Sequence, residues 1–146
     1  MASQVLGIKN LQKNLKQLAK DVKEKDLNYA TRKAANPIRD KARENAPVES
    51  GRLREDIVTR KTTKYSEYDS EYTVGIRNRK RGRKGDPNRI PPAVYGPFVE
   101  FGTSKQPAQP FIRPAYDSEG PKTLQRFNDV LSKRIRLRVK QGKIKV

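Results

Sequence analysis

The residue types that most often carry out chemistry in proteins are scarce in this chain. It has no histidine and no cysteine, which removes imidazole acid–base catalysis, thiolate nucleophiles, and imidazole or thiolate metal sites. Glu67, Asp69 and Glu71 alternate within five residues and could hold Mg²⁺ in a carboxylate nuclease, although a solvated surface explains them better. The run Gly82–Gly85 lacks the glycine spacing of a P-loop. We therefore predict a protein that is not an enzyme and uses no cofactor or metal ion.

The charged residues are mostly basic and are concentrated in two stretches. The chain has 34 Lys and Arg against 16 Asp and Glu, a net charge of +18. Residues 77–90 hold seven basic residues and one acid, and residues 133–145 hold seven and no acid, so together they supply 13 of the 18 net charges. Clusters of this kind bind nucleic-acid phosphates or acidic protein surfaces. We expect them to be appendages of a domain with an unremarkable charge.

The length of 146 residues fits one domain with a modest core. Leu, Ile, Val and Phe make up 31 residues, which is close to the level at which a highly charged chain stays disordered. We therefore expect a partner or an oligomer that buries further surface. We assign residues 1–140 to a single domain with a basic loop insertion at 77–90, and residues 141–146 to a basic C-terminal tail.

The sequence predicts a soluble protein. No apolar run approaches the length of a membrane span, and the start Met1–Gln4 lacks the pattern of a signal peptide. The lack of cysteine fits assembly in a reducing cytoplasm.

Apolar periodicity predicts three amphipathic helices. The first covers about residues 8–24, with a stripe of Leu11, Leu15, Leu18 and Val22. The second runs from Leu27 to Ala42 and ends before Pro47, with Asp26 as its cap. Pro37 either kinks this helix or lies in the first turn of a separate helix capped by Asn36, and the apolar stripe that stays in phase through the proline favours one kinked helix. The third follows Pro121, with Leu124, Phe127, Leu131 and Ile135 on its apolar face and Ser118 or Asp117 near its cap.

Two segments rich in β-branched residues, 57–63 and 72–77, predict strands. Eight of the ten prolines lie between Pro87 and Pro121, which argues against a long helix there. Within that region Phe98–Phe101 predicts a short strand or a helical turn that ends at Gly102. The order of elements predicts an α+β fold, a small antiparallel sheet packed against N-terminal helices and a C-terminal helix.

Two ordered motifs resemble those of one family. The first is Val99-Glu100-Phe101-Gly102-Thr103, followed by Pro107-Ala108-Gln109-Pro110-Phe111 and Arg113-Pro114-Ala115. The second lies upstream, Ala46-Pro47-Val48-Glu49-Ser50-Gly51-Arg52-Leu53, with Ser50 where that family usually has Thr. Both resemble the signature of the siphophage tail-component family typified by the tenth gene product of bacteriophage HK97, over about residues 5–135.

This resemblance implies a structural virion protein of the phage neck or tail top, assembled in the host cytoplasm. It would form a homo-oligomeric ring, commonly sixfold, that joins the head to the tail or completes the tail tube, and its partners would be other neck, connector and tail proteins. We expect the Pro-rich segment to form the interface with a neighbouring subunit, through Glu100, Phe101, Gly102, Thr103, Pro107, Pro110, Phe111, Arg113 and Pro114.

Some of these residues have a simpler interpretation. Glu100 could lie on the wet face of a strand, or pair with Arg113 or with an arginine of a neighbouring subunit. Phe111 and Ile112 fit core plugs as well as partner anchors. Gly51 and Gly102 fit turns that need a positive φ.

The basic loop at 77–90 is not explained by the resemblance. It could be a solvated hairpin tip, contact the acidic surface of a neighbouring ring, or make transient contact with DNA phosphates. The residues concerned are Arg79, Lys80, Arg81, Arg83 and Lys84. The alternative function is a basic nucleic-acid-binding protein that contacts the DNA backbone.

Overall fold

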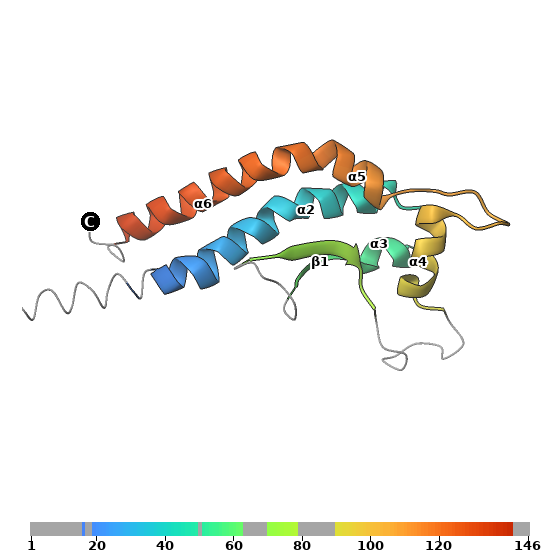
Figure 1. The fold of residues 1–146 in the computed structure, drawn as a ribbon, viewed down its shortest axis with the longest axis horizontal. Helices are drawn as coiled ribbons and strands as arrows, with labels where there is room; N and C mark the ends of the chain where they lie inside the picture. Colours follow the sequence, from blue (N-terminus) through green and yellow to red (C-terminus); the bar gives the residue numbers. More distant parts are fainter. Residues whose placement is uncertain (1–15, 17–18, 50, 63–69, 79–89, 142–146) are drawn as a thin grey trace, which may run out of the picture.

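The computed structural model is built around two long helical runs that lie side by side (Figure 1). It describes residue 16 and residues 19–49, 51–62, 70–78 and 90–141. The first run joins the π-helix η1 (Val22–Leu27) to α2 (Asn28–Asn45). The second joins α5 (Ile112–Glu119), the 3₁₀ turn η2 (Gly120–Lys122) and α6 (Thr123–Lys140). The two runs are antiparallel (Figure 1).

Helix α2 continues through Pro37 and ends at Asn45, so the predictions of one helix and of its end before Pro47 are confirmed. Its alanines, Ala30, Ala34, Ala35 and Ala42, are buried. The predicted cap is wrong, because Asp26 lies inside the helical run and binds arginines of α6 instead. Most of the first predicted helix lies outside the described residues.

The strands β1 (Ile57–Lys61) and β2 (Tyr72–Ile76) pair antiparallel, with Ile57 opposite Ile76 and Lys61 opposite Tyr72. Both strands lie against α2. The α+β fold with a small antiparallel sheet is thus confirmed.

Two short helices flank the sheet. Helix α3 (Arg52–Asp56) follows Gly51, whose φ of 68° is a conformation that glycine adopts without a steric penalty. Helix α4 (Pro92–Phe101) starts with a proline and continues through Pro97. The sequence predicted only a short strand or turn here, but a proline in the first helical turn gives up no hydrogen bond, so only Pro97 weakens the helix.

The core lies where α2, α3, β1 and α5 meet, and is formed by Ile38, Ala42, Ala46, Leu53, Ile57, Phe111 and Ala115. Phe111 and Ile57 are its largest fully buried side chains. Each such side chain stabilises the fold by roughly 1.5–3 kcal/mol. No helix in the described part of the chain is both long enough and apolar enough to cross a membrane.

The third predicted helix is confirmed, because α6 begins at Thr123, just after Pro121, but its predicted caps are wrong. Asp117 lies inside α5, and the hydroxyl of Ser118 donates to the carbonyl of Ala115, so neither caps α6. Helix α6 ends at Lys140, the position at which the sequence placed the end of the domain.

Candidate functional site

Glu100 connects α4 to the start of α5. One carboxylate oxygen accepts the backbone N–H groups of Phe111 at 2.7 Å and Ile112 at 3.0 Å, and the other accepts that of Arg113 at 3.0 Å. These are N–H groups that the first turn of a helix leaves without partners. Glu100 is therefore a cap for α5 supplied by another helix.

The environment of Glu100 favours the charged carboxylate. Burial alone would raise the pKa of this side chain, but the three backbone N–H donors and the guanidinium of Arg113 outweigh it, so the pKa lies below its ordinary value of 4.5. Glu100 is only 8% exposed. The interpretation as the wet face of a strand is wrong, because Glu100 lies on a helix. The predicted partner Arg113 does attract the carboxylate, although the hydrogen bonds of Glu100 go to backbone N–H groups. Pairing with an arginine of a neighbouring subunit stays a prediction.

Residues 102–110, which we call the arm, project from the body of the molecule between α4 and α5 (Figure 1). Thr103 and Gln106 exchange two backbone hydrogen bonds of 2.8 and 3.3 Å. The hydroxyl of Thr103 also accepts the N–H groups of Lys105 and Gln106. At the other end, the N–H of Gln109 donates to the carbonyl of Val99 at 2.8 Å. All residues from 103 to 110 are exposed, so the arm is both exposed and fixed in shape.

Gly102 allows the arm to fold back on α4. Its φ is 75°, and a Cβ at this position would lie 2.7 Å from the backbone nitrogen of Ala108. The predicted need for a positive φ at Gly51 and Gly102 is confirmed.

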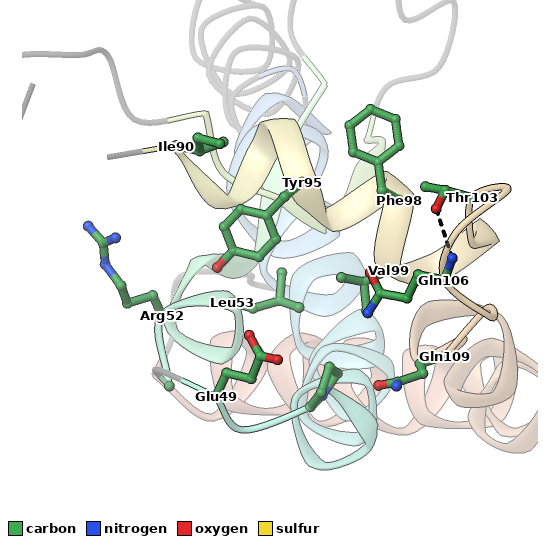
Figure 2. A pocket seen from close by; sticks show the side chains of 12 residues that line it. Glu49, Arg52, Leu53, Ile90, Tyr95, Phe98, Val99, Thr103, Gln106 and Gln109 are labelled. Carbon is green, nitrogen blue, oxygen red and sulfur yellow. Dashed lines mark hydrogen bonds between the residues drawn. The ribbon is translucent and has the colours of Figure 1, made fainter. Parts of the chain in front are cut away.

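A row of exposed apolar side chains, the α4 stripe, lies beside the arm. It consists of Ile90, Val94, Phe98 and Phe101, which are 56, 53, 54 and 71% exposed. In Figure 2, Tyr95 and Val99 point toward Leu53 of α3, whereas Phe98 points away from them. A cavity of about 710 Å³ lies between α3, α4 and the arm. Exposed aromatic clusters of this kind mark interaction surfaces.

The structure brings most of the predicted interface residues together around the arm. Thr103, Pro107 and Pro110 lie in the arm, Phe101 and Gly102 at its start, and Arg113 and Pro114 in the first turn of α5. Phe111 and Glu100 are the exceptions, because Phe111 is completely buried in the core of its own chain and Glu100 is buried as the cap of α5. The interpretation of Phe111 as a core plug is confirmed, and its assignment to a contact surface is corrected. The basic-loop residues 79–89 lie outside the described part of the chain.

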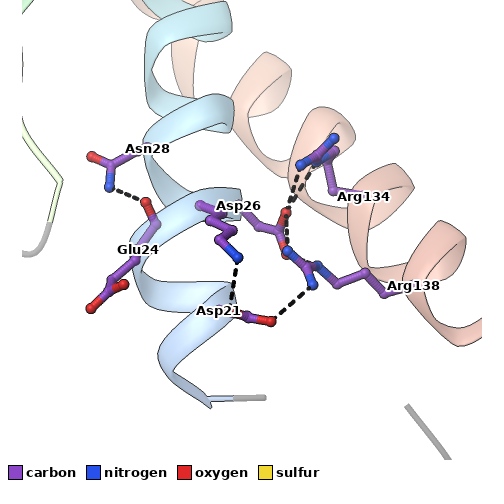
Figure 3. Close-up of polar contacts among 7 residues, drawn as sticks. Asp21, Glu24, Asp26, Asn28, Arg134 and Arg138 are labelled. Carbon is purple, nitrogen blue, oxygen red and sulfur yellow. Dashed lines mark hydrogen bonds and ion pairs between the residues drawn. The ribbon is translucent and has the colours of Figure 1, made fainter. Parts of the chain in front are cut away.

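A buried ion-pair cluster was missed by sequence reasoning (Figure 3). Asp26 is fully buried and receives hydrogen bonds from Nε of Arg134 at 3.1 Å and from Arg138. Nη2 of Arg134 also lies 3.0 Å from the same carboxylate oxygen as an ion pair. Arg138 also lies 3.5 Å from the carboxylate of Asp21. The guanidinium of Arg134 lies over the ring of Tyr29, 4.6 Å from its centre. We call Asp21, Asp26, Arg134 and Arg138 the Asp26 clamp.

The Asp26 clamp changes the interpretation of the C-terminal basic stretch. Two of its seven basic residues are used inside the fold, while Lys133, Arg136 and Lys140 are exposed. The sequence held a signal for this arrangement, since Arg134 and Arg138 are four residues apart and so share one face of a helix.

Comparison with protein families gives one match that covers most of the chain. Residues 9–102 match the family described as "Bacteriophage HK97-gp10, putative tail-component". The chain belongs to this family, as the two sequence motifs predicted, and is a structural component of a phage tail. The match ends at Gly102, so most of the arm and all of α5 and α6 follow the matched residues. Comparisons with curated proteins and with solved structures find no match.

Proposed function

We propose that this tail component is a non-enzymatic subunit of a closed ring, commonly sixfold, in the phage neck. The ring joins the head to the tail or completes the tail tube. Its partners are further copies of the chain and the adjoining neck and tail proteins. Membership of the tail-component family supports this role, and the arm is the structural feature that carries it.

The arm suits an assembly contact because it is rigid before it binds. Its residues bury little surface within the chain, yet prolines and four hydrogen bonds around Thr103 and Gln106 hold their conformation. An element fixed in advance loses little conformational entropy when it docks. The α4 stripe beside it supplies the apolar surface that a stable interface needs.

Ring formation can be tested with the purified protein by mass photometry and negative-stain electron microscopy. We expect ring-sized particles from the wild type, and monomers from the double variant Phe98→Ser/Phe101→Ser. Leu137→Ser is the matched control, because this leucine is also exposed but lies in the last turn of α6. Figure 1 shows that this end of α6 is far from α4. A wild type that stays monomeric at all concentrations, or a double variant that assembles normally, contradicts the proposal. Circular dichroism confirms that each variant is folded.

The high net charge favours one other function, binding to the DNA backbone. The Asp26 clamp weakens this alternative, because Arg134 and Arg138 are neutralised inside the fold. A DNA-binding protein would shift duplex DNA in a gel with an affinity that falls steeply as salt rises. Tight, salt-sensitive DNA binding by a chain that forms no ring favours this alternative over the neck role.

A further inference from the structure

The outer edge of β2 carries backbone groups that no strand in the described part of the chain pairs. Backbone hydrogen bonds join Thr62 to Glu71 and Arg77 to Asp56 at the two ends of the ladder. Because hydrogen-bonded pairs alternate along an antiparallel ladder, the backbone groups of Tyr72, Val74 and Ile76 point away from β1. Within the described part of the chain, those of Tyr72 and Val74 make no backbone hydrogen bond on that side.

An apolar groove runs along this edge, with a volume of about 760 Å³. Its floor is formed by Ala34, Ala35 and Ile38 of α2, and of the two described strands only β2 lines it. The opposite wall comes from α5 and α6, where Tyr116 and Leu124 are 63 and 70% exposed. A groove between a strand edge and a helix is the form of site that receives an added strand.

An added strand would pair the open groups of β2 and cover the exposed side chains of the groove at the same time.

The C-terminal tail has the sequence pattern of such a strand. Lys143, Ile144, Lys145 and Val146 alternate basic and apolar residues, which is the pattern of a strand with one apolar face. The groove has acids nearby that complement the lysines. Glu71 immediately precedes Tyr72, and Asp117, which is exposed, follows Tyr116.

The reach of Ile144 favours a tail that comes from another copy of the chain. Ile144 lies four residues beyond the end of α6 at Lys140, a reach of at most ~14 Å. Leu124 lies 16 residues back from Lys140 along the same helix, a distance of ~24 Å. Ile144 therefore cannot reach Leu124 of its own chain.

We propose that residues 141–146 of one subunit add a third strand to β2 of a second subunit. Ile144 and Val146 face the alanine floor of α2, and Lys143 and Lys145 face solvent. This inference rests on the proposed assembly of copies and deepens it, because it names the segment and the groove that meet. A contact between two different surfaces, repeated around an axis, generates a ring when its rotation closes.

Cysteine cross-linking in the full-length protein tests the proposal, since the natural chain has no cysteine. One population carries Leu124→Cys and a second, isotope-labelled population carries Ile144→Cys. After mixing and mild oxidation, we expect disulfide-linked heterodimers by mass spectrometry. Leu137→Cys replaces Leu124→Cys in the control, and we expect several-fold fewer heterodimers from it. Equal yields from the two positions overturn the proposal.

A peptide experiment separates apolar docking from charge attraction. In the full-length variant Ile144→Ser/Val146→Ser, the tails should no longer fill the grooves of other copies, so the grooves are free to bind a peptide. The probe is a fluorescent peptide with the sequence of residues 141–146. We expect saturable binding at least tenfold tighter than that of the same peptide with serine at 144 and 146. Equal binding of the two peptides, or no binding of either, overturns the proposal. Neither readout needs head–tail joining, so the two proposals can fail separately. Cross-links without virion incorporation contradict only the neck role. Rings without cross-links contradict only the tail-strand contact.

Discussion

Glu100 sits at the junction of three parts of the molecule, with its backbone in α4, its carboxylate at the start of α5 and the arm in between. A single side chain thus fixes both ends of the arm. Removing the acceptor would leave three N–H groups with only partial access to water. This site lies 11 to 13 residues from Glu100 in sequence, which no helical or strand periodicity would indicate.

We expect Glu100→Ala to destabilise the fold by about 2 kcal/mol, because the cap and the partners of three N–H groups are lost. Glu100→Gln keeps an acceptor oxygen and should cost less. Urea denaturation of both variants at neutral pH measures the difference. A Glu100→Ala variant as stable as the wild type would show that the cap contributes nothing.

The lowered pKa of Glu100 also makes stability depend on pH. The carboxylate contributes its full stabilisation of the fold above the ordinary pKa of 4.5. This stabilisation is lost as the pH falls below 4.5 and through the lower pKa of the folded state. The stability difference between wild type and Glu100→Gln should therefore shrink between pH 6 and pH 3. Glu55→Gln, at an exposed position of α3, is the matched control. A difference that stays constant over this range contradicts the assignment.

We expect Asp26→Ala to destabilise the fold by about 3–5 kcal/mol, because it leaves Arg134 and Arg138 partly buried without their shared carboxylate. Asp40→Ala is the control, since its ion pair with Arg39 lies at the surface and should contribute at most about 1 kcal/mol. Denaturation curves of the two variants provide the comparison, and equal losses would contradict the role of the clamp.

At the scale of elements, the sequence predicted those whose signal is local. The strands were predicted because β-branched residues cluster in them, and α2 because its alanine stripe stays in phase through Pro37. Helix α4 was missed because its prolines occupy positions that a helix tolerates or compensates elsewhere. The start of α5 was missed because its cap, Glu100, comes from another helix.

Three glycine substitutions separate backbone strain from crowding in these elements. Gly102→Ala would place an alanine at a positive φ and its Cβ 2.7 Å from a backbone atom. Gly51→Ala would have only the unfavourable positive φ, and Gly75→Ala would have neither problem. We expect the loss of stability to be largest for Gly102→Ala, about 1 kcal/mol for Gly51→Ala, and smallest for Gly75→Ala. Melting temperatures give the order, and a Gly102→Ala variant as stable as Gly75→Ala would contradict the geometry of the arm.

At the scale of the whole molecule, the basic residues behind the net charge of +18 divide into those that pair within the fold and those that can contact other molecules. The family followed from the sequence motifs and the α+β fold from the order of the predicted elements, whereas the division of charge followed from neither. The Asp26 clamp joins residues more than 100 positions apart, and only the folded chain shows that part of the basic C-terminal stretch is internal.

For the basic loop at 77–90 we expect most cations to meet the acidic surface of a neighbouring ring, and a minority to reach DNA. Replacing Arg79, Lys80, Arg81, Arg83 and Lys84 by serine should leave ring formation largely intact, because surface ion pairs add little to stability. Joining of heads to tails should fall, and raised salt should reproduce the defect in the wild type. Normal joining by the five-serine variant would contradict this role.

The Asp26 clamp also bears on the order of events during synthesis. Asp26 is made early and its partner Arg138 follows 112 residues later. On the ribosome, the N-terminal helical run must wait with an unpartnered acid on its inner face until α6 emerges. The two long helical runs can then close on each other only as a late step of translation. Such a delay would keep a newly made chain from assembling with other copies before its α6 has been synthesised.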